Sequence, residues 1–312
     1  MQKTSSLYPL YIIILNWNLP ADTIVCIHSV IQGIRPLRDH IQIVVVDNGS
    51  TDDSIAQFRT TFGTEIEIIE VGQNLGFAGG MNVGMCYAIG QGASTVLLLN
   101  NDTEVATEMI PALLAAAEQK PSAGILGPLI YYYDLPDTIW QLGDQEQPWL
   151  PVPLRIAPDV PAIAKGEPFR VDYITGCCLL LRRGVLERIG LFDERYFMYF
   201  EEADLCRRVR DAGYEIWSVP AARMWHKVAT STQKDRPGQR YWRTWGKTQF
   251  FTQHRHGRLP WLIYFYLLGK IVLTTSHDLI AGDWQLIAPL WAGTVDGYQG
   301  SSKRRAKYFR TR

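Results

Sequence analysis

Polar side chains follow three apolar segments of this sequence, at points where they could bind a phosphorylated ligand. Residues 41–46 run into Asp47, residues 65–71 lead to Asn74, and residues 95–99 end in Asn100-Asn101-Asp102. One such loop alone is typical of a turn or a helix cap, because Asn, Gly, Ser and Asp favour both. Three of them after consecutive segments favour a shared binding site.

Two residues could hold a divalent cation, Asp102 at the end of the third apolar segment and His226 further along the chain. Mg²⁺ needs only one or two carboxylates when substrate phosphates supply further ligands, so Asp102 is sufficient in principle. The alternative is that Asp102 caps its own turn or the helix that begins near Thr107. His226 follows a strand-like stretch, 220–225, and is either a core histidine or a further ligand of the same cation.

Glu201 and Glu202 are the candidates for acid–base chemistry. They follow the aromatic stretch 197–200, where partial desolvation would raise a carboxyl pKa toward the range useful for a general base. The alternative is structural, since acidic residues also suit the first turn of a helix. Asp204 lies on another side of the same helix, and we expect it to serve structure.

Alternating strands and helices must position these residues. The expected strands are 10–15, 41–46, 65–71 and 95–99, and the expected helices are 21–31, 52–62, 78–89 and 107–119. This alternation predicts an α/β fold with a Rossmann-like, mostly parallel sheet flanked by helices. Ligands bind beyond the carboxyl ends of such strands, which is where the polar loops fall.

The following region is expected to be less regular. Residues 131–169 are Pro-rich and predict a long loop or lid over the acceptor side. Residues 171–181 predict a returning strand, and 201–212 predict a helix that ends at Gly213.

Composition limits the function classes. The chain has 312 residues, with 31 Lys and Arg against 31 Asp and Glu. From residue 227 onward there are 15 basic and 4 acidic residues, so the front carries about −11 and the back about +11. This asymmetry indicates that the basic C-terminal part binds an anionic surface. The acidic N-terminal part argues against nucleic acid as a partner of the whole protein. The hydrophobic content of 47% excludes a disordered chain.

The cysteines and the N-terminus favour a cytoplasmic protein. Five Cys, with no Cys-x-x-Cys pair, make a disulfide scaffold or a cysteine zinc site improbable. The apolar stretch that ends at Leu15 runs into Asn16-Trp17-Asn18 rather than a cleavage site, so no signal peptide is expected.

Two nucleotide-binding signatures are missing from their expected places. The first strand is followed by residues 16–20 without a glycine, which argues against a dinucleotide-binding dehydrogenase, and no P-loop is present. A nucleotidyltransferase remains an alternative, although it would want a Gly-rich, basic loop at this point. A non-catalytic, membrane-bound carbohydrate-binding module is the other alternative.

The last part of the chain is basic and aromatic. Residues 259–275 are almost wholly apolar, but about 17 residues are at the lower limit for a membrane-spanning helix. A helix lying in the membrane interface, with basic residues toward anionic lipid, fits better. The alternative is a soluble helical cap over the active site.

Six stretches, in order along residues 8–230, carry a family resemblance. They are ILNWN (14–18), VVVDNGSTD (44–52), NLGFAGGMN (74–82), LLNNDT (98–103), GLFDE with YFEEADL (190–194 and 199–205), and Trp225-His226. As a set they resemble the inverting GT-A glycosyltransferases of the large second family, among them the bacterial rhamnosyltransferase and galactofuranosyltransferase-like members.

The resemblance implies a role for each matched residue. It implies a GT-A catalytic domain over residues 1–230 and a helical, basic extension over 231–312. Glu202 matches the general base, with Glu201 beside it, and Asp102 and His226 match ligands of Mg²⁺ or Mn²⁺. The implied donor-binding residues are Asn16, Asp47, Asn74, Gly79, Asn82, Asn101 and Asp102.

The sequence departs from the family pattern at two of these places. The metal motif reads Asn-Asn-Asp, which leaves one carboxylate, and the base is Glu where this group usually has Asp.

The resemblance also implies a reaction. A sugar, rhamnose among the candidates, would move with inversion from a dTDP- or UDP-linked donor to a hydroxyl of a glycan or of a polyprenyl-diphosphate-linked acceptor. Such a reaction would serve cell-surface polysaccharide synthesis. The enzyme would then be cytoplasmic and peripheral on the inner face of the cell membrane.

Overall fold

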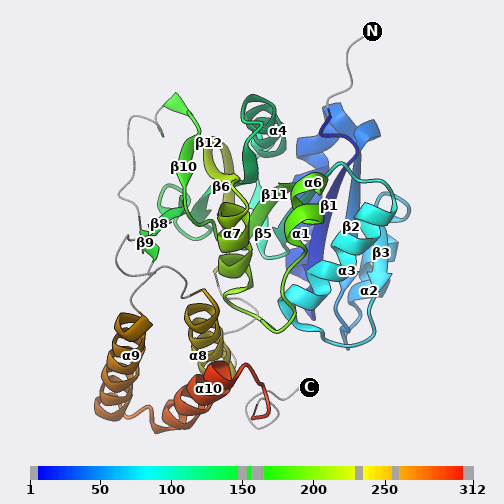
Figure 1. Cartoon of the computed structure of the whole chain (residues 1–312). Helices are drawn as coiled ribbons and strands as arrows, with labels where there is room; N and C mark the ends of the chain where they lie inside the picture. Colours follow the sequence, from blue (N-terminus) through cyan, green and yellow to red (C-terminus); the bar gives the residue numbers. More distant parts are fainter. Residues whose placement is uncertain are drawn as a thin grey trace.

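A computed structural model describes residues 6–146, 153–155, 163, 165–228, 235–254 and 260–304. A large mixed sheet lies between two layers of helices, and three further helices form a separate group below it (Figure 1). The boundary expected near residue 230 and the basic end beyond residue 304 lie outside the described residues.

The strands are short and mostly buried. In chain order they are β1 (Leu10–Asn16), β2 (Ile41–Asp47), β3 (Glu67–Glu70), β4 (Thr95–Asn100), β5 (Thr103–Val105), β6 (Ala123–Tyr132), β7 (Ile139–Gln141), β8 (Asp144–Glu146), β9 (Pro153–Arg155), β10 (Phe169–Val171), β11 (Cys178–Arg182) and β12 (Glu215–His226).

The helices fall into an N-terminal group around the sheet and a C-terminal group. The first comprises α1 (Pro20–Ile34), η1 (Arg35–His40), α2 (Ser54–Phe62), α3 (Gly76–Gly90), α4 (Met109–Gln119), α6 (Arg183–Ile189) and α7 (Glu201–Asp211). The second comprises α8 (Arg236–Gln253), α9 (Pro260–Ile280), η2 (Trp284–Leu286) and α10 (Ile287–Gln299).

The sheet has the order β10-β12-β6-β11-β4-β1-β2-β3. Strands β3, β2, β1 and β4 are mutually parallel, and β6 pairs in parallel with β12, while β11 runs antiparallel between β4 and β6. The predicted α/β fold is therefore confirmed, with a parallel part from β3 to β4 and a mixed part beyond it. Because β1, β2 and β4 are parallel, the polar residues that follow them meet at one edge of the sheet.

Side chains of β1 alternate between two apolar cores. Ile12 and Ile14 pack on the face that carries α1, α2 and α4, whereas Ile13 packs on the face that carries α3, α6 and α7. Both faces are buried, as expected of parallel strands with crossover helices, and the continuous apolar runs in the sequence follow from this.

Helix α3 lies unusually close to the sheet. A Cβ added to Gly80 would lie 2.5 Å from Cδ1 of Leu15, and one added to Gly84 would meet Ile13. The glycines of this segment therefore allow α3 to begin directly against the strand ends.

Two sequence predictions in the middle of the chain are wrong. Residues 171–181 do not form one strand, because the edge strand β10 ends at Val171 and the central strand β11 begins at Cys178. Residues 131–169 are not a continuous loop either, since β7 and β8 lie within their described part. β7 and β8 are three residues long and depend on pairing with β6 and β9, so their own residues carry too short a pattern to mark them.

The C-terminal helices have their own aromatic core, which reaches into the catalytic part. Trp242 and Trp245 of α8 pack with Tyr196 and Phe197, and the Phe197 and Trp242 rings stack with centroids 5.0 Å apart. These helices are thereby anchored to the segment that precedes Glu201. Among the described residues, no helix is long and apolar enough to cross a membrane.

Candidate active site

A buried hydrogen-bond network joins the ends of β1, β2 and β4. Asn16 donates to Asp47 Oδ1 (2.9 Å) and accepts from the Thr23 hydroxyl (2.8 Å). The same hydroxyl accepts from Asn101 (2.8 Å), while Ser50 donates to Asp47 Oδ1 (2.6 Å). The structure thus brings together the three predicted donor-binding residues Asn16, Asp47 and Asn101. Asn16 and Asp47 are both buried, and Asn16 orients the Asp47 carboxylate.

A second link holds the turn before α3. Asn48 donates to Asn74 Oδ1 (3.2 Å) and to the carbonyl of Gly76 (3.0 Å), and it accepts from the backbone of Leu75 (3.0 Å). The predicted donor-binding residue Asn74 is therefore tied to the end of β2. Gly79 lies buried in the first turn of α3, where an added Cβ would lie 2.8 Å from Leu75 Cβ.

Asn82 has a different environment from the other predicted donor-binding residues. Its amide donates to Phe192 O (2.9 Å) and Glu194 (3.0 Å), and its oxygen accepts from Phe192 N (3.0 Å). The structure does not join Asn82 to the strand-end network. Its side chain fixes the 192–194 segment against α3 instead.

Asp102 and His226 lie side by side, as the metal hypothesis requires. Strand β12 pairs with β5 so that His226 lies opposite Thr103, and His226 Nε2 is 3.2 Å from Asp102 Oδ1. Both side chains are nearly buried. Burial disfavours the charged imidazole, but the Cys177 sulfur and the Asp102 carboxylate outweigh it and raise the pKa of His226 to about 10. The imidazole is therefore protonated at neutral pH and pairs with the Asp102 carboxylate, so it has to lose this proton before Nε2 can bind a cation.

The geometry of this pair fits two ligands of one hard cation. Asp102 Oδ1 is buried and has no partner other than His226 among the described residues. Two ligand atoms at about 2.1 Å and right angles to each other around Mg²⁺ are about 3 Å apart, which is close to the 3.2 Å separation here. The described residues contain no cluster of three or more His, Cys, Asp or Glu around one point. A cation here would need its remaining ligands from a substrate diphosphate and water.

The turn that presents Glu201 and Glu202 is strained. Tyr199 and Phe200 have φ angles of 68° and 74°, in the left-handed region that favours glycine. Such strain persists only where the surroundings enforce it, and it concentrates at functional sites. It points both glutamates into the protein at the first turn of α7.

The two glutamates have different environments. Burial, followed by the neighbouring Glu202, raises the pKa of Glu201 well above its usual value, and Glu201 Oε2 has no hydrogen-bond partner. Burial also raises the pKa of Glu202, but Tyr173 donates to Glu202 Oε1 (2.6 Å), and backbone N–H groups assist it in stabilising the carboxylate. Glu202 is the more exposed residue of the two and is therefore better placed to accept a proton from a substrate.

The segment from Tyr173 to Cys177 joins the glutamates to the Asp102–His226 pair. Gly176 is so close to Glu202 that an added Cβ would lie 3.4 Å from Glu202 Cβ. The next residue, Cys177, has its sulfur 3.8 Å from His226 Nε2. One short segment thus separates the base candidate from the cation site, and the two lie on the same side of the molecule.

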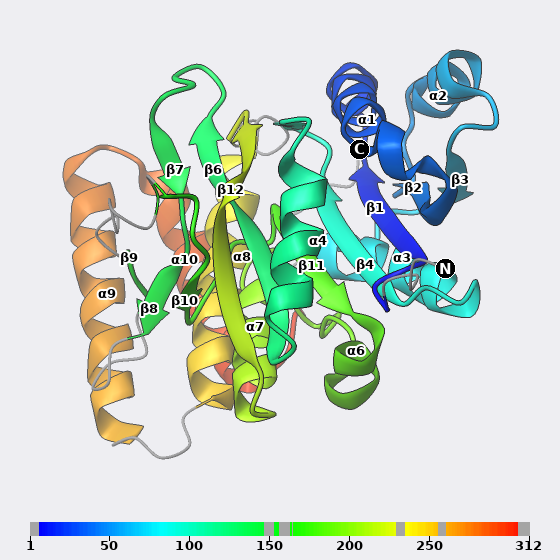
Figure 2. The same ribbon diagram turned by 90° about the horizontal axis from the view of Figure 1, so that it is seen from above.

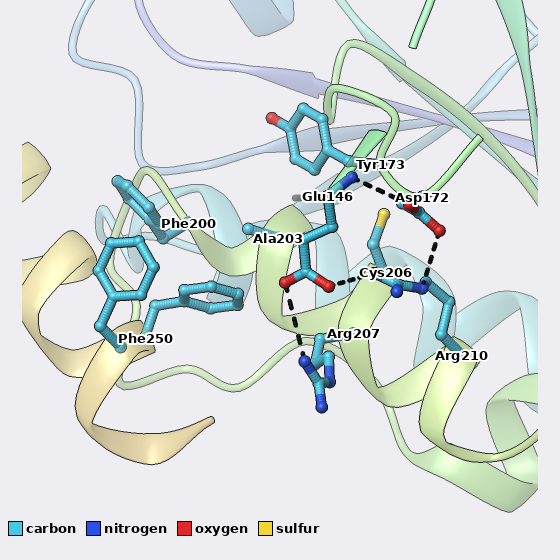
Figure 3. Close-up of a pocket in the computed structure, with 10 residues that line it drawn as sticks. Glu146, Asp172, Tyr173, Phe200, Ala203, Cys206, Arg207, Arg210 and Phe250 are labelled. Atoms are coloured by element: carbon cyan, nitrogen blue, oxygen red, sulfur yellow. Dashed lines mark hydrogen bonds and ion pairs between the residues drawn. The ribbon is translucent and has the colours of Figure 1, made fainter. Parts of the chain in front are cut away.

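A hollow of about 410 Å³, including its open mouth, lies beside α7 and is lined there by Ala203 and Cys206 (Figure 3). At one end Glu146 pairs with Arg207 (3.7 Å) and Arg210 (2.8 Å). At the other end are the rings of Phe200 and Phe250. The ion pairs of Glu146 with Arg207 and Arg210 attach the strand pair β8–β9 to α7. Tyr173 lines the same hollow.

The sequence-based prediction missed three residues of this site: Asn48, Tyr173 and Cys177. Asn48 was within a noted motif, and its position directly after a strand was a usable signal. Tyr173 and Cys177 flank Thr175-Gly176 in a segment predicted as strand, and their partners are 29 and 49 residues away. No spacing rule links such residues.

The comparison with protein families gives a direct result. Residues 11–190 match the model of Glycosyl transferase family 2. An N-acetylglucosaminyl-diphospho-decaprenol L-rhamnosyltransferase of Mycobacterium tuberculosis is 30% identical over 268 residues, which cover 77% of this chain and 83% of the relative. The dTDP-rhamnosyl transferase RfbF of Shigella flexneri is 22% identical over 76% of this chain and 78% of its own.

Solved structures share the fold. The mannosyltransferase PcManGT from Pyrobaculum calidifontis, in complex with GDP-Man and Mn²⁺, has a TM-score of 0.57 at 17% identity and covers 96% of this chain and 78% of its own. GalNAc-T7 with UDP, GalNAc and Mn²⁺ has a TM-score of 0.59 at 19% identity over 72% of this chain, which spans 44% of that protein. The GT-A architecture expected from the sequence is confirmed.

These matches decide between the classes that the sequence left open, a glycosyltransferase, a nucleotidyltransferase and a carbohydrate-binding module. The family model covers β1 to α6, and the matched relatives that carry functional names transfer sugars. The chain belongs to glycosyl transferase family 2 and is a glycosyltransferase of GT-A fold with a helical C-terminal extension.

Proposed function

We propose that this enzyme transfers rhamnose, with inversion, from a dTDP- or UDP-linked donor to a hydroxyl of a glycan or polyprenyl-diphosphate-linked acceptor in cell-surface polysaccharide synthesis. The observation that carries the proposal is that the short segment 173–177 contacts both Glu202 and His226. Tyr173 and Gly176 lie against Glu202, and Cys177 lies against His226. A sugar bound between the two would face a base on one side and a diphosphate site on the other.

The donor assignment is supported by the polar edge of the sheet. Asp47, oriented by Asn16 and Ser50, would bind the base or ribose, and the turn at Asn74 lies beside it. The printed names of the mycobacterial and Shigella relatives both describe rhamnosyl transfer, and the second names a dTDP-linked sugar. These names favour dTDP-rhamnose among the possible donors.

Asp102 and His226 would hold the divalent cation, Mg²⁺ or Mn²⁺. When bound, such a cation stabilises the negative charge that grows on a departing diphosphate. The chain's own part is to place a buried carboxylate oxygen of Asp102 and the Nε2 atom of His226 3.2 Å apart, beyond the end of β4 and at the end of β12.

Glu202 would remove the proton from the acceptor hydroxyl as that oxygen attacks the anomeric carbon. Tyr173 holds Glu202 Oε1, which leaves Oε2, an atom with no hydrogen-bond partner, for the acceptor. Attack from the side opposite the diphosphate inverts the configuration at that carbon.

The acceptor and the place of action follow from the relatives. The mycobacterial relative is named for a diphospho-decaprenol-linked sugar. A polyprenyl carrier is confined to the bilayer, so we infer that this enzyme is cytoplasmic and works as a peripheral protein at the anionic inner surface of the membrane. Exposed apolar side chains on α9, among them Phe265 and Leu273, support this inference.

A donor assay tests the proposal. Purified enzyme is incubated with dTDP-rhamnose and a panel of UDP-sugars, with and without Mn²⁺, and the released nucleotide is identified by chromatography. Release of a nucleoside diphosphate from dTDP-rhamnose, stimulated by Mn²⁺, is expected, with an inverted anomeric centre in the product by NMR. Release of a nucleoside monophosphate would contradict sugar transfer, and a retained configuration would contradict the role of Glu202.

A further inference from the structure

Helices α8 and α9 run side by side in opposite directions, and their contacts fix which residues face each other. The rings of Phe251 and Tyr266 have centroids 5.7 Å apart, and Arg240 pairs with Asp278 at 3.2 Å. Between these two contacts, one turn from the aromatic pair, Lys247 lies opposite Lys270. Arg243 of α8 follows one turn further along.

These three cations have no acidic partner. Among the described residues, no carboxylate forms an ion pair with Arg243, Lys247 or Lys270. Asp278, the acidic residue of α9, is already paired with Arg240. Burial, and then the like charges of Lys270, Arg240 and Arg243, lower the pKa of Lys247. Like charges held together without a counter-charge favour binding of an anion.

The cluster lies next to the catalytic glutamates. The Arg243 guanidinium lies 4.7 Å from the centre of the Tyr199 ring, three residues before Glu202. Helix α8 approaches this turn so closely that a Cβ on Gly246 would lie 2.7 Å from the Tyr199 carbonyl oxygen. An anion bound between α8 and α9 would therefore be on the Glu202 side of the active site.

Beyond the cluster, α9 exposes a broad apolar surface. Ile263, Leu267 and Ile271 are buried in one stripe of this helix. The other sides expose apolar side chains, which are Trp261, Tyr264, Phe265, Leu268, Val272, Leu273, Leu279 and Ile280. A ligand with an anionic head and an apolar tail would match both parts.

We propose that Arg243, Lys247 and Lys270 bind the diphosphate of a prenyl-diphosphate acceptor, whose chain runs along α9. The choice of a prenyl diphosphate rests on the proposed function, while the presence of an anion site rests on the three side chains alone. Lys and Arg both bind phosphate oxygens well, and two lysines facing each other across a helix pair can contact both phosphates.

Calorimetric titration of the full chain with farnesyl diphosphate, without divalent cations, tests this site. The double variant Lys247→Met/Lys270→Gln should bind the probe at least about a hundred-fold more weakly, since each of the two lost charge-assisted contacts accounts for roughly ten-fold or more. The matched control is Lys165→Gln, which changes an exposed lysine outside α8 and α9 and should leave binding of the probe unchanged. Removing like charges should leave the melting temperature of the double variant unchanged or higher.

The outcomes separate this proposal from its rivals. Unchanged affinity of the double variant for farnesyl diphosphate would overturn the site. Lysine-dependent binding of phosphatidylglycerol vesicles without binding of farnesyl diphosphate would reassign it to a lipid headgroup and overturn the acceptor role. If no donor is turned over but farnesyl diphosphate still binds through the lysines, the proposed function fails while this site stands.

Discussion

At the scale of single residues, the site depends on which carboxylate is held ready to accept a proton. Tyr173 donates a short hydrogen bond to Glu202, while the Glu201 carboxyl is buried beside it with an unpartnered oxygen. Pairs of acids whose environments differ in this way divide acid and base roles between them. We therefore propose Glu202 as the base, and we expect Glu201, whose pKa is raised further by burial and by Glu202, to keep its proton up to a higher pH than Glu202.

Tyr173→Phe tests how Glu202 is tuned. The hydroxyl stabilises the carboxylate and so lowers the pKa of Glu202, which burial has raised. Without the hydroxyl the pKa rises further, and Glu202 is then protonated up to a higher pH. The acidic limb of the kcat–pH profile should move to higher pH, with a larger loss of kcat at pH 6 than at pH 8. An unshifted profile would remove Tyr173 from this role.

Asp102→Asn tests the cation site. The amide has no charge, so donor affinity should no longer increase when Mn²⁺ is added, as measured by calorimetric titration with dTDP-rhamnose. Asp137→Asn, at an exposed aspartate, is the control and should keep the Mn²⁺ effect. Mn²⁺-stimulated turnover by Asp102→Asn would place the cation elsewhere.

Whether a site residue could be predicted from the sequence depends on how it reaches its partners. Asp47, Asn74 and Asp102 were predictable because parallel strands bring their ends to one edge. Asn82 shows the limit of that reasoning, because the same motif contains both site residues and residues that fix a neighbouring loop. Tyr173 and Cys177 reach their partners only through tertiary packing, so local patterns could not identify them.

At the scale of elements, close helix contacts hold the C-terminal group together. Helix α10 crosses α8 at two glycines one turn apart. An added Cβ on Gly293 would lie 2.5 Å from the Tyr241 carbonyl oxygen, and one on Gly297 would lie 2.6 Å from that of Trp245. Only glycine allows the two backbones to approach in this way.

Gly293→Ala should therefore destabilise the protein although alanine is the better helix former. Overpacking of this kind costs about 1–3 kcal/mol in the free energy of unfolding. Gly269→Ala is the matched control, because no atom lies within 4 Å of an added Cβ there, and it should stabilise α9 by about 0.5–1 kcal/mol. Urea denaturation measures both, and equal effects of the two substitutions would contradict the close crossing.

Element prediction from sequence succeeded for the strands that alternate with the predicted helices, but it missed β6, although eight of its ten residues are buried. The strands β1, β2 and β4 are buried on both faces, and their apolar runs mark them within one residue of their ends. The three-residue strands β7 and β10 have mixed burial and were missed. Their existence depends on the neighbouring strands β6 and β12.

At the scale of the whole molecule, charge and apolar surface are both concentrated in the C-terminal helices. The residues from 227 onward carry the basic excess. In the described part of the chain, α9, η2 and α10 also expose five tryptophan or tyrosine rings, at Trp261, Tyr264, Trp284, Trp291 and Tyr298. Figure 2 shows these helices grouped on one side of the sheet. Aromatic and basic residues together are typical of surfaces that bind the lipid interface.

The double variant Phe265→Glu/Leu268→Glu tests this surface. Phe265 and Leu268 are 68% and 53% exposed, so the two substitutions should leave the fold intact. Partitioning into phosphatidylglycerol-containing vesicles should fall by roughly a hundred-fold, as measured by flotation, because two apolar side chains no longer insert. Leu135→Glu, at a 59% exposed leucine in the catalytic part, should float like the wild type. Equal flotation of all three proteins would contradict membrane binding through α9.

The most direct test of the central claim is a comparison of Glu202→Gln with Glu201→Gln. In single-turnover transfer from dTDP-rhamnose, Glu202→Gln should be about 10²–10⁴-fold slower than the wild type, since it lacks the general base. Its affinity for the donor, measured by calorimetric titration, should be nearly unchanged, and Glu201→Gln should lose much less activity. Wild-type rates in Glu202→Gln, or a loss confined to donor binding, would contradict the assignment of Glu202 as the base.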